Sequence, residues 1–197
     1  MKKFGLLILL FCGLFTAFAG DDREAVAAIV RDFRAAQLTF DFNKLLTLCT
    51  TDYVQINQDG SQRTYADLQR IAQAFARIEQ SDDLEEILVN YWLITGKTLN
   101  EEQLQLIRQA KNTEFGRNLA AEYKGQIAAV KAAYAQIAEQ KDQWSPLVEI
   151  NGNEAEAILA VKTSSGALAY RTCYKLKKVD GKWLIYRNEH MGATVTQ

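Results

Sequence analysis

The chain has 197 residues, among them 23 basic and 24 acidic side chains, one histidine and three cysteines. A formal net charge of −1 without a basic stripe argues against nucleic acid or an anionic membrane surface as a partner. One histidine and dispersed cysteines do not supply a metal-ligand cluster, and we expect neither a metal nor a cofactor.

The first nineteen residues have the pattern of a cleavable export signal. Lys2 and Lys3 form a positive start, and residues 4–18 are almost unbroken apolar sequence. Ala17 and Ala19 are small residues at the two positions that a signal peptidase reads. The apolar run is shorter than the roughly 20 residues that a membrane-spanning helix needs, so the pattern favours cleavage.

The alternative is a lipid anchor at Cys12, which has a leucine three residues before it. The bulky Phe11 argues against this alternative, because lipid-modifying cleavage prefers a small residue directly before the cysteine. We therefore expect residues 1–19 to be removed. The mature protein is expected to be exported, to the periplasm or the medium, without a membrane span.

The next sixty residues predict helices around one strand. Apolar residues at helical spacing predict a helix over about 21–39, and Asp41 is placed to cap a short second helix. Residues 53–57 alternate as in a strand, and the Asp-Gly pair at 59–60 signals a turn behind it. Residues 64–67 have the spacing of a capping box, which predicts the start of a third helix.

A helical block follows, from about residue 82 to 143, with apolar side chains at three-four spacing. Residues 96–97 are expected to separate its first helix from its second, which we start at a capping box over 98–101. In the third helix, Gly116 and Gly125 are expected to be tolerated weak points.

The last fifty residues alternate or run apolar in segments separated by turn signals. The predicted strands are 147–150, 155–163, 167–177 and 182–190, with turns at 151–153, 164–166 and 180–181. Antiparallel strands with helices on one side form an α+β domain.

Two cysteines, Cys49 and Cys173, remain after processing. In an oxidising compartment they could form a disulfide. The interpretation that we favour is two separate buried thiols acting as small hydrophobic residues, because a core of this size needs no cross-link.

Residues 42–57, with the turn and helix behind them, and residues 174–185 resemble the nuclear transport factor 2-like superfamily, in particular its SnoaL-like branch. The resemblance implies an α+β fold in which N-terminal helices pack on a curved, cone-like antiparallel sheet. Residues 20–197 then form a single domain with a helical insertion at about 82–143. The insertion would cover the open end of the cone or form a dimer surface.

The resemblance also implies a conical cavity, which is an enzyme site in some members and a binding pocket in others. The polar side chains expected to reach it are Tyr53, Gln55, Tyr170, Arg171, Tyr174, Arg187, Glu189 and His190. Tyr53 and Gln55 share a strand face and could hydrogen-bond a ligand, although Tyr53 could equally pack against the helices. Arg171 and Arg187 could clamp a carboxylate between neighbouring strands. The plainer interpretation, which we favour, is two solvated arginines.

His190 is the only histidine, and its usual pKa suits proton transfer. Glu189 precedes it, but neighbours in a strand point to opposite faces, so the two are not expected to act as a pair. We regard His190 first as an ordinary hydrogen-bonding residue and second as a catalytic candidate.

Three functions stay open. The first is an exported, non-catalytic module that binds a small molecule or a protein, and the lack of a matched acid–base set favours it. The second is a small isomerase, lyase or hydrolase acting on an anionic or apolar molecule, with His190 or a tyrosine as the reacting group and Arg171 for an anion. The third is a structural protein that forms a homodimer, which a long exposed apolar face over 99–140 would support.

Overall fold

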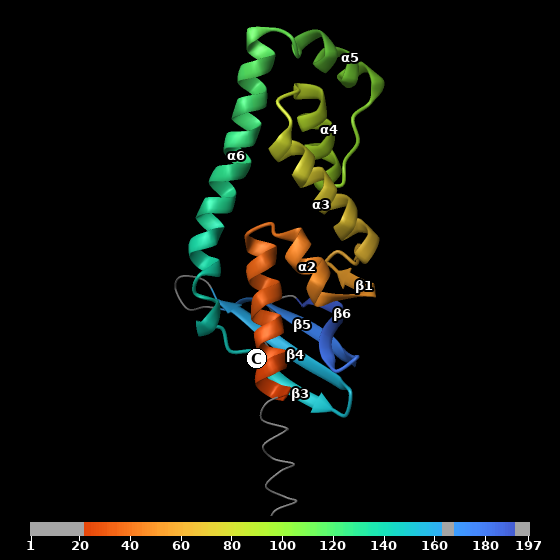
Figure 1. Cartoon of the computed structure of the whole chain (residues 1–197), viewed down its shortest axis with the longest axis vertical. Helices are drawn as coiled ribbons and strands as arrows, with labels where there is room; N and C mark the ends of the chain where they lie inside the picture. Colours follow the sequence, from red (N-terminus) through yellow and green to blue (C-terminus); the bar gives the residue numbers. More distant parts are fainter. Residues whose placement is uncertain (1–21, 163–167, 192–197) are drawn as a thin grey trace, which may run out of the picture. The chain divides into compact units, whose positions relative to one another are not determined.

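The computed structural model describes residues 22–162 and 168–191 (Figure 1). The predicted export signal and the predicted turn at 164–166 therefore lie outside the described residues. The chain divides into two compact units. The sheet unit comprises described residues 22–33, 48–63, 142–162 and 168–191, and the helical unit comprises residues 34–47 and 64–141.

The strands of the sheet unit form one open sheet in the order β2-β1-β6-β5-β4-β3 (Figure 1). Their bounds are β1 Cys49–Ile56, β2 Gln62–Thr64, β3 Leu147–Asn151, β4 Glu154–Lys162, β5 Leu168–Val179 and β6 Lys182–Met191. From β3 to β6 neighbouring strands are antiparallel, whereas β1 pairs with β6 in parallel. The four predicted C-terminal strands are confirmed. The three-residue β2 was not predicted, because it is too short to show alternation.

The β5–β6 hairpin closes through the predicted turn. Asp180 and Gly181 have φ values of 49° and 78°, the positive pair that a two-residue type I′ turn requires. Further along β6, Ile185 pairs with Leu176 and Arg187 with Lys175, so Tyr186 is an extra residue in its strand. Such a bulge bends the strand and increases its twist.

The first helix, residues 22–38, is unlabelled and orange in Figure 1, and its N-terminal part belongs to the core of the sheet unit. Its side chains Val26, Val30 and Phe33 are fully buried. The ring of Phe33 lies 5.9 Å from the Tyr53 ring and 5.7 Å from the Tyr174 ring. A helix thus packs on one face of a mainly antiparallel sheet, and the predicted α+β class is confirmed.

Asp22 fixes the start of this helix on the β5–β6 hairpin. Its carboxylate accepts hydrogen bonds from Lys178 Nζ at 2.8 Å and from Trp183 Nε1 at 2.9 Å. These two bonds hold the pKa of Asp22 below its usual value. A negative charge in the first turn also suits the helix dipole.

The helical unit is built from amphipathic helices whose apolar faces meet. Their bounds are α2 Phe42–Leu48, α3 Tyr65–Gln80, α4 Leu84–Ile94, α5 Glu101–Ala110 and α6 Glu114–Ala138, with a 3-10 turn at Lys141–Gln143. The best-buried residues of one core cluster are Ile78, Leu84, Ile87, Leu88 and Ala120. The last residue of α2 belongs to the sheet unit, as do the last two of the 3-10 turn. The helical unit therefore contains all but the last two residues of the predicted insertion, together with all of α3 and most of α2.

One of the two predicted capping boxes is confirmed. Thr64 and Asp67 exchange side-chain and backbone hydrogen bonds at the start of α3. The box predicted over 98–101 is wrong: α5 is capped by Asn100, which exchanges the same pair of bonds with Gln103. Both tetrapeptides fit the pattern, and capping at Asn100 leaves the preceding residue, Leu99, packed against the core.

Gly116 is not the tolerated weak point that the sequence suggested. A Cβ at this position would lie 2.1 Å from the carbonyl oxygen of Ala110, so the turn between α5 and α6 needs glycine. Gly125, by contrast, has open space around the same position.

Candidate functional site

One face of the sheet carries a row of polar side chains, most of which are buried. Residues directly opposite one another in neighbouring strands point to the same side. Asn188 is opposite Tyr174, whose ring contacts the first helix, and His190 is opposite Thr172. We call this side the covered face. Its polar members are Tyr53, Gln55, Tyr170, Thr172, Tyr174, Asn188 and His190.

A hydrogen-bond network crosses the covered face between β1 and β6. Tyr53 Oη donates to Asn188 Oδ1 at 3.1 Å and lies 3.5 Å from Gln55 Oε1. Gln55 Nε2 in turn donates to Asn57 Oδ1 at 2.8 Å. Burial raises the pKa of Tyr53 well above its usual value, so its hydroxyl stays protonated and acts as a donor.

Asn188 is the most deeply placed member of this network. Its side chain is 0% exposed, and its Nδ2 has no hydrogen-bond partner among the described residues. A buried amide that lacks an acceptor is costly and uncommon in native proteins. Stability therefore does not account for the unpaired amide of Asn188, which makes it a candidate functional group.

The network ends at an open depression of about 460 Å³. The depression is lined by Asn57, Gln58, Asp59, Tyr170 and His190. Asn57 belongs to both the network and the lining, so it connects the buried amide of Gln55 with the surface. On the other side, His190 Nδ1 lies 3.3 Å from Thr172 Oγ1, and the Tyr170 ring meets the His190 ring edge-on at 6.1 Å.

The structure brings together only part of the predicted set. Tyr53 and Gln55 belong to the network, and Tyr170 and His190 line the depression. Tyr174 lies in the core, in contact with the first helix.

The two predicted arginines lie on the opposite face. Arg171 is opposite Met191 and Arg187 is opposite Lys175, four residues apart along β5, which is about 13 Å at about 3.3 Å per residue. They do not form the carboxylate clamp, and Arg187 is instead paired with Glu189. Glu189 and His190 point to opposite faces, as the strand period predicts.

Five members of the site were not predicted: Asn57, Thr172 and Asn188, which make its hydrogen bonds, and Gln58 and Asp59, which line the depression. A signal was present for Asn57, Thr172 and Asn188, since each lies two residues from a predicted member of the covered face, in the same strand or directly after its end. Applying the period of two to Gln55, Tyr170 and His190 would have found them and would have excluded the arginines.

Neither cysteine takes part in this site as a nucleophile. Both Cys49 and Cys173 are buried free thiols. Burial raises the pKa of Cys49 well above its usual value and that of Cys173 to about 11. Within residues 22–162 and 168–191, no group of three or more His, Cys, Asp or Glu side chains could hold a metal ion. None of the helices described there combines the length and apolar character needed to cross a membrane.

No protein-family profile and no curated protein matches this sequence. Solved structures similar to the chain include an NTF2-like protein with a cystatin-like fold from Novosphingobium aromaticivorans, with 13% identity over 100% of this chain and 94% of that one, at a TM-score of 0.40. An NTF2-like protein from Cytophaga hutchinsonii has 11% identity over 86% and 97%, at a TM-score of 0.40. A protein of unknown function with a cystatin-like fold from Nostoc punctiforme has 11% identity over 88% and 92%, also at 0.40. These are proteins of the kind that the sequence resembles, and similarity at this level carries no argument about ligand, reaction or partner.

Proposed function

We propose that this protein is an exported, non-catalytic module that binds a small, uncharged molecule rich in hydrogen-bonding groups at the covered face. The observation that carries the proposal is the buried amide of Asn188, whose Nδ2 finds no acceptor among the described residues. A ligand acceptor that reached this group would remove the cost of leaving it unpaired. The hydrogen-bond network links Asn188 through Tyr53 and Gln55 to Asn57, which lines the depression.

The chemistry of the ligand is inferred from the side chains that would meet it. Gln55, Asn57 and Asn188 are neutral amides, the kind of side chain that hydrogen-bonds neutral hydroxyl, amide or carbonyl groups. The Tyr170 ring offers an apolar contact at the depression. Arg171 and Arg187 lie on the other face, and Asp59 lines the rim, so the charges do not favour an anion.

The acid–base properties of the site support binding over catalysis. The raised pKa of Tyr53 makes its hydroxyl a poor base at neutral pH. Hydrogen bonds from the Ser61 side chain and backbone hold the pKa of Asp59 below its usual value, so it is a weak base as well. Glu189 points away from His190 and pairs with Arg187.

The test of binding is NMR with a library of small neutral polar compounds. Compounds that bind are expected to shift the NMR signals of the side-chain amides of Gln55, Asn57 and Asn188. The Asn188→Leu variant is expected to bind these compounds at least about tenfold more weakly. Arg171→Gln, on the opposite face, is the matched control and is expected to leave the affinity unchanged. Hits that bind Asn188→Leu as tightly as the wild type would refute the proposal. Conversion of a hit into a product would favour the enzyme alternative.

Export is proposed from the sequence of residues 1–19 alone. The full chain would be expressed in a bacterium, and the secreted or periplasmic fraction analysed by intact-mass spectrometry. We expect the measured mass to be that of a polypeptide whose first residue is Gly20. Retention of the full chain in the cytoplasm, or a lipid-modified Cys12, would contradict this part of the proposal.

A further inference from the structure

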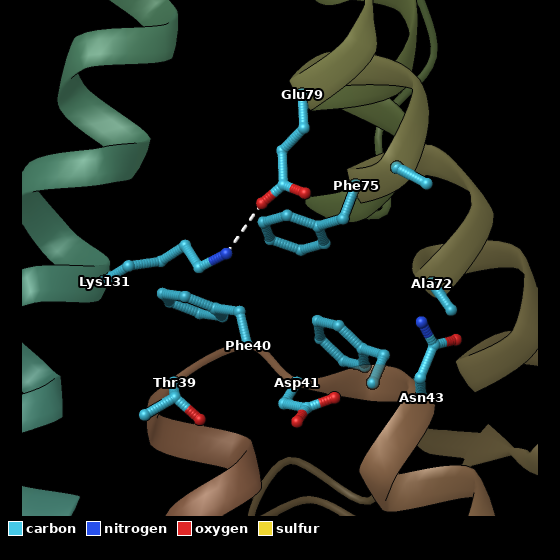
Figure 2. A pocket seen from close by; sticks show the side chains of 10 residues that line it. Thr39, Phe40, Asp41, Asn43, Ala72, Phe75, Glu79 and Lys131 are labelled. Atoms are coloured by element: carbon cyan, nitrogen blue, oxygen red, sulfur yellow. Dashed lines mark hydrogen bonds and ion pairs between the residues drawn. The ribbon is translucent and has the colours of Figure 1, made fainter.

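A second cavity, of about 340 Å³, lies within the helical unit (Figure 2). Its walls include the rings of Phe40, Phe42 and Phe75. Phe75 stacks with both others, at centroid distances of 5.4 Å to Phe40 and 5.2 Å to Phe42 and with interplanar angles of 19° and 26°. We call this cavity the phenylalanine pocket. Its volume is within the range of small-ligand sites.

Phe40 is held in this wall by an unusual backbone. The first helix ends in a Schellman motif, in which Asp41 N donates to Ala36 O and Phe40 N donates to Gln37 O. This motif places Phe40 at the left-handed position, with φ 55°, where glycine is strongly preferred. A bulky residue there carries strain of about 1 kcal/mol or more. The chain therefore places the Phe40 ring in the pocket wall at a position where glycine would remove the backbone strain.

The charges around the rings are unequal. Asp41 and Glu79 contribute two carboxylates to the lining, and Lys131 contributes one ammonium group. Lys131 Nζ lies 2.6 Å from Glu79 Oε1, and Figure 2 shows this lysine reaching from α6 toward the rings. Asp41 Oδ1 accepts the backbone N–H of Lys44 at 2.9 Å. The three charged side chains together carry a net charge of −1.

Aromatic faces and an excess of carboxylates are the chemistry that recognises an organic cation. The face of a phenylalanine ring is the negative end of its quadrupole and attracts ammonium groups. An anion would be repelled by the same ring faces and by the two carboxylates. Lys131, a cation supplied by the chain itself, already lies in the pocket beside Glu79.

We propose that the phenylalanine pocket binds an organic cation of the alkylammonium type. The ligand's ammonium group takes the place of the Lys131 ammonium beside Glu79 and contacts the phenylalanine rings, and the Lys131 side chain moves toward solvent. The proposal concerns the helical unit alone and does not depend on the function proposed for the sheet unit.

The test compares two probes of nearly the same shape. Choline carries a quaternary nitrogen where 3,3-dimethyl-1-butanol carries a carbon. Calorimetric titration of the mature protein is expected to show choline binding at least about tenfold more tightly than the alcohol, the difference that a cation–π contact of about 1.4 kcal/mol makes. Equal affinity would reduce the site to an apolar cavity and overturn the proposal, as would the absence of choline binding.

Variants of the charged residues give results of opposite sign. Glu79→Gln is expected to weaken choline binding, because it removes the carboxylate beside the ligand. Lys131→Met is expected to strengthen it, because it removes the competing ammonium group. The matched control is Lys124→Met: Lys124 lies two turns earlier on α6, bonded to Asp82 and Ser81 and outside the pocket lining. If Lys131→Met abolished binding, or if Lys124→Met strengthened it equally, the proposed displacement would be wrong.

Phe40→Gly separates the pocket from the stability of the fold. Glycine fits the left-handed backbone at this position, so the helix end is expected to form as before. The variant loses one ring wall, and choline affinity is expected to fall several-fold. Unchanged affinity in a folded Phe40→Gly protein would show that the ring takes no part in the site.

Discussion

The two units bury polar side chains in different ways. In the sheet unit, Thr50, Gln55, Thr172 and Asn188 are buried, and the bond from Tyr53 to Asn188 joins residues 135 positions apart. In the helical unit, Asn90 is buried, but its Nδ2 donates to the Glu86 carbonyl one turn earlier on the same helix.

The difference shows what each unit needs for stability. Apolar faces and local caps are enough to assemble helices, as the core around Ile87 and the cap at Asn100 show. The sheet unit also has an apolar core, so its long-range polar network is an addition that packing does not require. Buried polar networks are costly unless every member is satisfied, and this one leaves the Asn188 amide without an acceptor among the described residues. This contrast is why the ligand site that we propose lies in the sheet unit.

The largest expected effect is the loss of a core ring. Phe33→Ala removes a fully buried side chain that contacts Tyr53 and Tyr174, and is expected to lower the unfolding free energy by about 3–5 kcal/mol. Because Phe33 supports the covered face, the NMR signals of the Asn188 side chain should shift as well. Ile87→Ala, in the helical unit, should cost about 2–5 kcal/mol without that shift. Urea unfolding measures both, and a cost below about 1 kcal/mol for Phe33→Ala would contradict the assigned core.

The second prediction contrasts two glycines of one helix. Gly116→Ala places a methyl group against the Ala110 carbonyl oxygen and is expected to cost about 2–3 kcal/mol. Gly125→Ala meets open space and is expected to stabilise α6 by about 1 kcal/mol, because alanine has the higher helix propensity. The melting temperature should fall for Gly116→Ala and rise for Gly125→Ala. Equal shifts would mean that the turn before α6 adapts to a side chain.

The third prediction separates binding from stability. Asn188→Leu and Asn90→Leu each replace a buried asparagine by a side chain of similar size. Both are expected to change the unfolding free energy by less than about 1.5 kcal/mol, since each loses one hydrogen bond and gains apolar contact. Only Asn188→Leu should weaken ligands found by NMR. A loss of binding in both variants would remove the contrast between the units.

The sequence predicted the elements that are long enough to show a periodic pattern and missed the shortest strand. Strands β3 to β6 each extend over five residues or more, so alternation and turn signals located them. β2 has three residues and shows no period. The start of α5 was displaced by two residues because Thr98 and Asn100 both open a valid capping pattern, and only packing of Leu99 decides between them.

The site was predicted in part for a related reason. Residue type alone selected Arg171 and Arg187 along with Tyr53 and Gln55, whereas the strand period assigns the arginines to the opposite face. The phenylalanine pocket had no local signal at all. Phe40 and Phe42 lie at a helix junction and Phe75 on a later helix, so only the folded helical unit brings them together.

The fourth prediction tests the corrected helix cap. Asn100→Ala is expected to lower the unfolding free energy by about 1 kcal/mol, because the backbone N–H of Gln103 loses its acceptor. Thr98→Ala, two residues earlier, should have an effect below about 0.5 kcal/mol. Chemical denaturation distinguishes the two. A larger cost for Thr98→Ala would restore the capping box that the sequence suggested.

The smallest expected effect concerns acid stability of the sheet unit. Hydrogen bonds from Lys178 and Trp183 lower the pKa of Asp22 in the folded protein. The stabilisation is therefore fully present above the pKa of the unfolded carboxyl, about 3.9, and is lost as the pH falls through the lower folded value. Because a third of the Asp22 side chain is exposed, the contribution is expected to stay below about 1 kcal/mol. Asp22→Asn should therefore be slightly less stable than the wild type at pH 6 and equal to it near pH 2. If the difference between the two proteins stayed constant across this range, the ionised carboxylate would not be what fixes the helix to the β5–β6 hairpin.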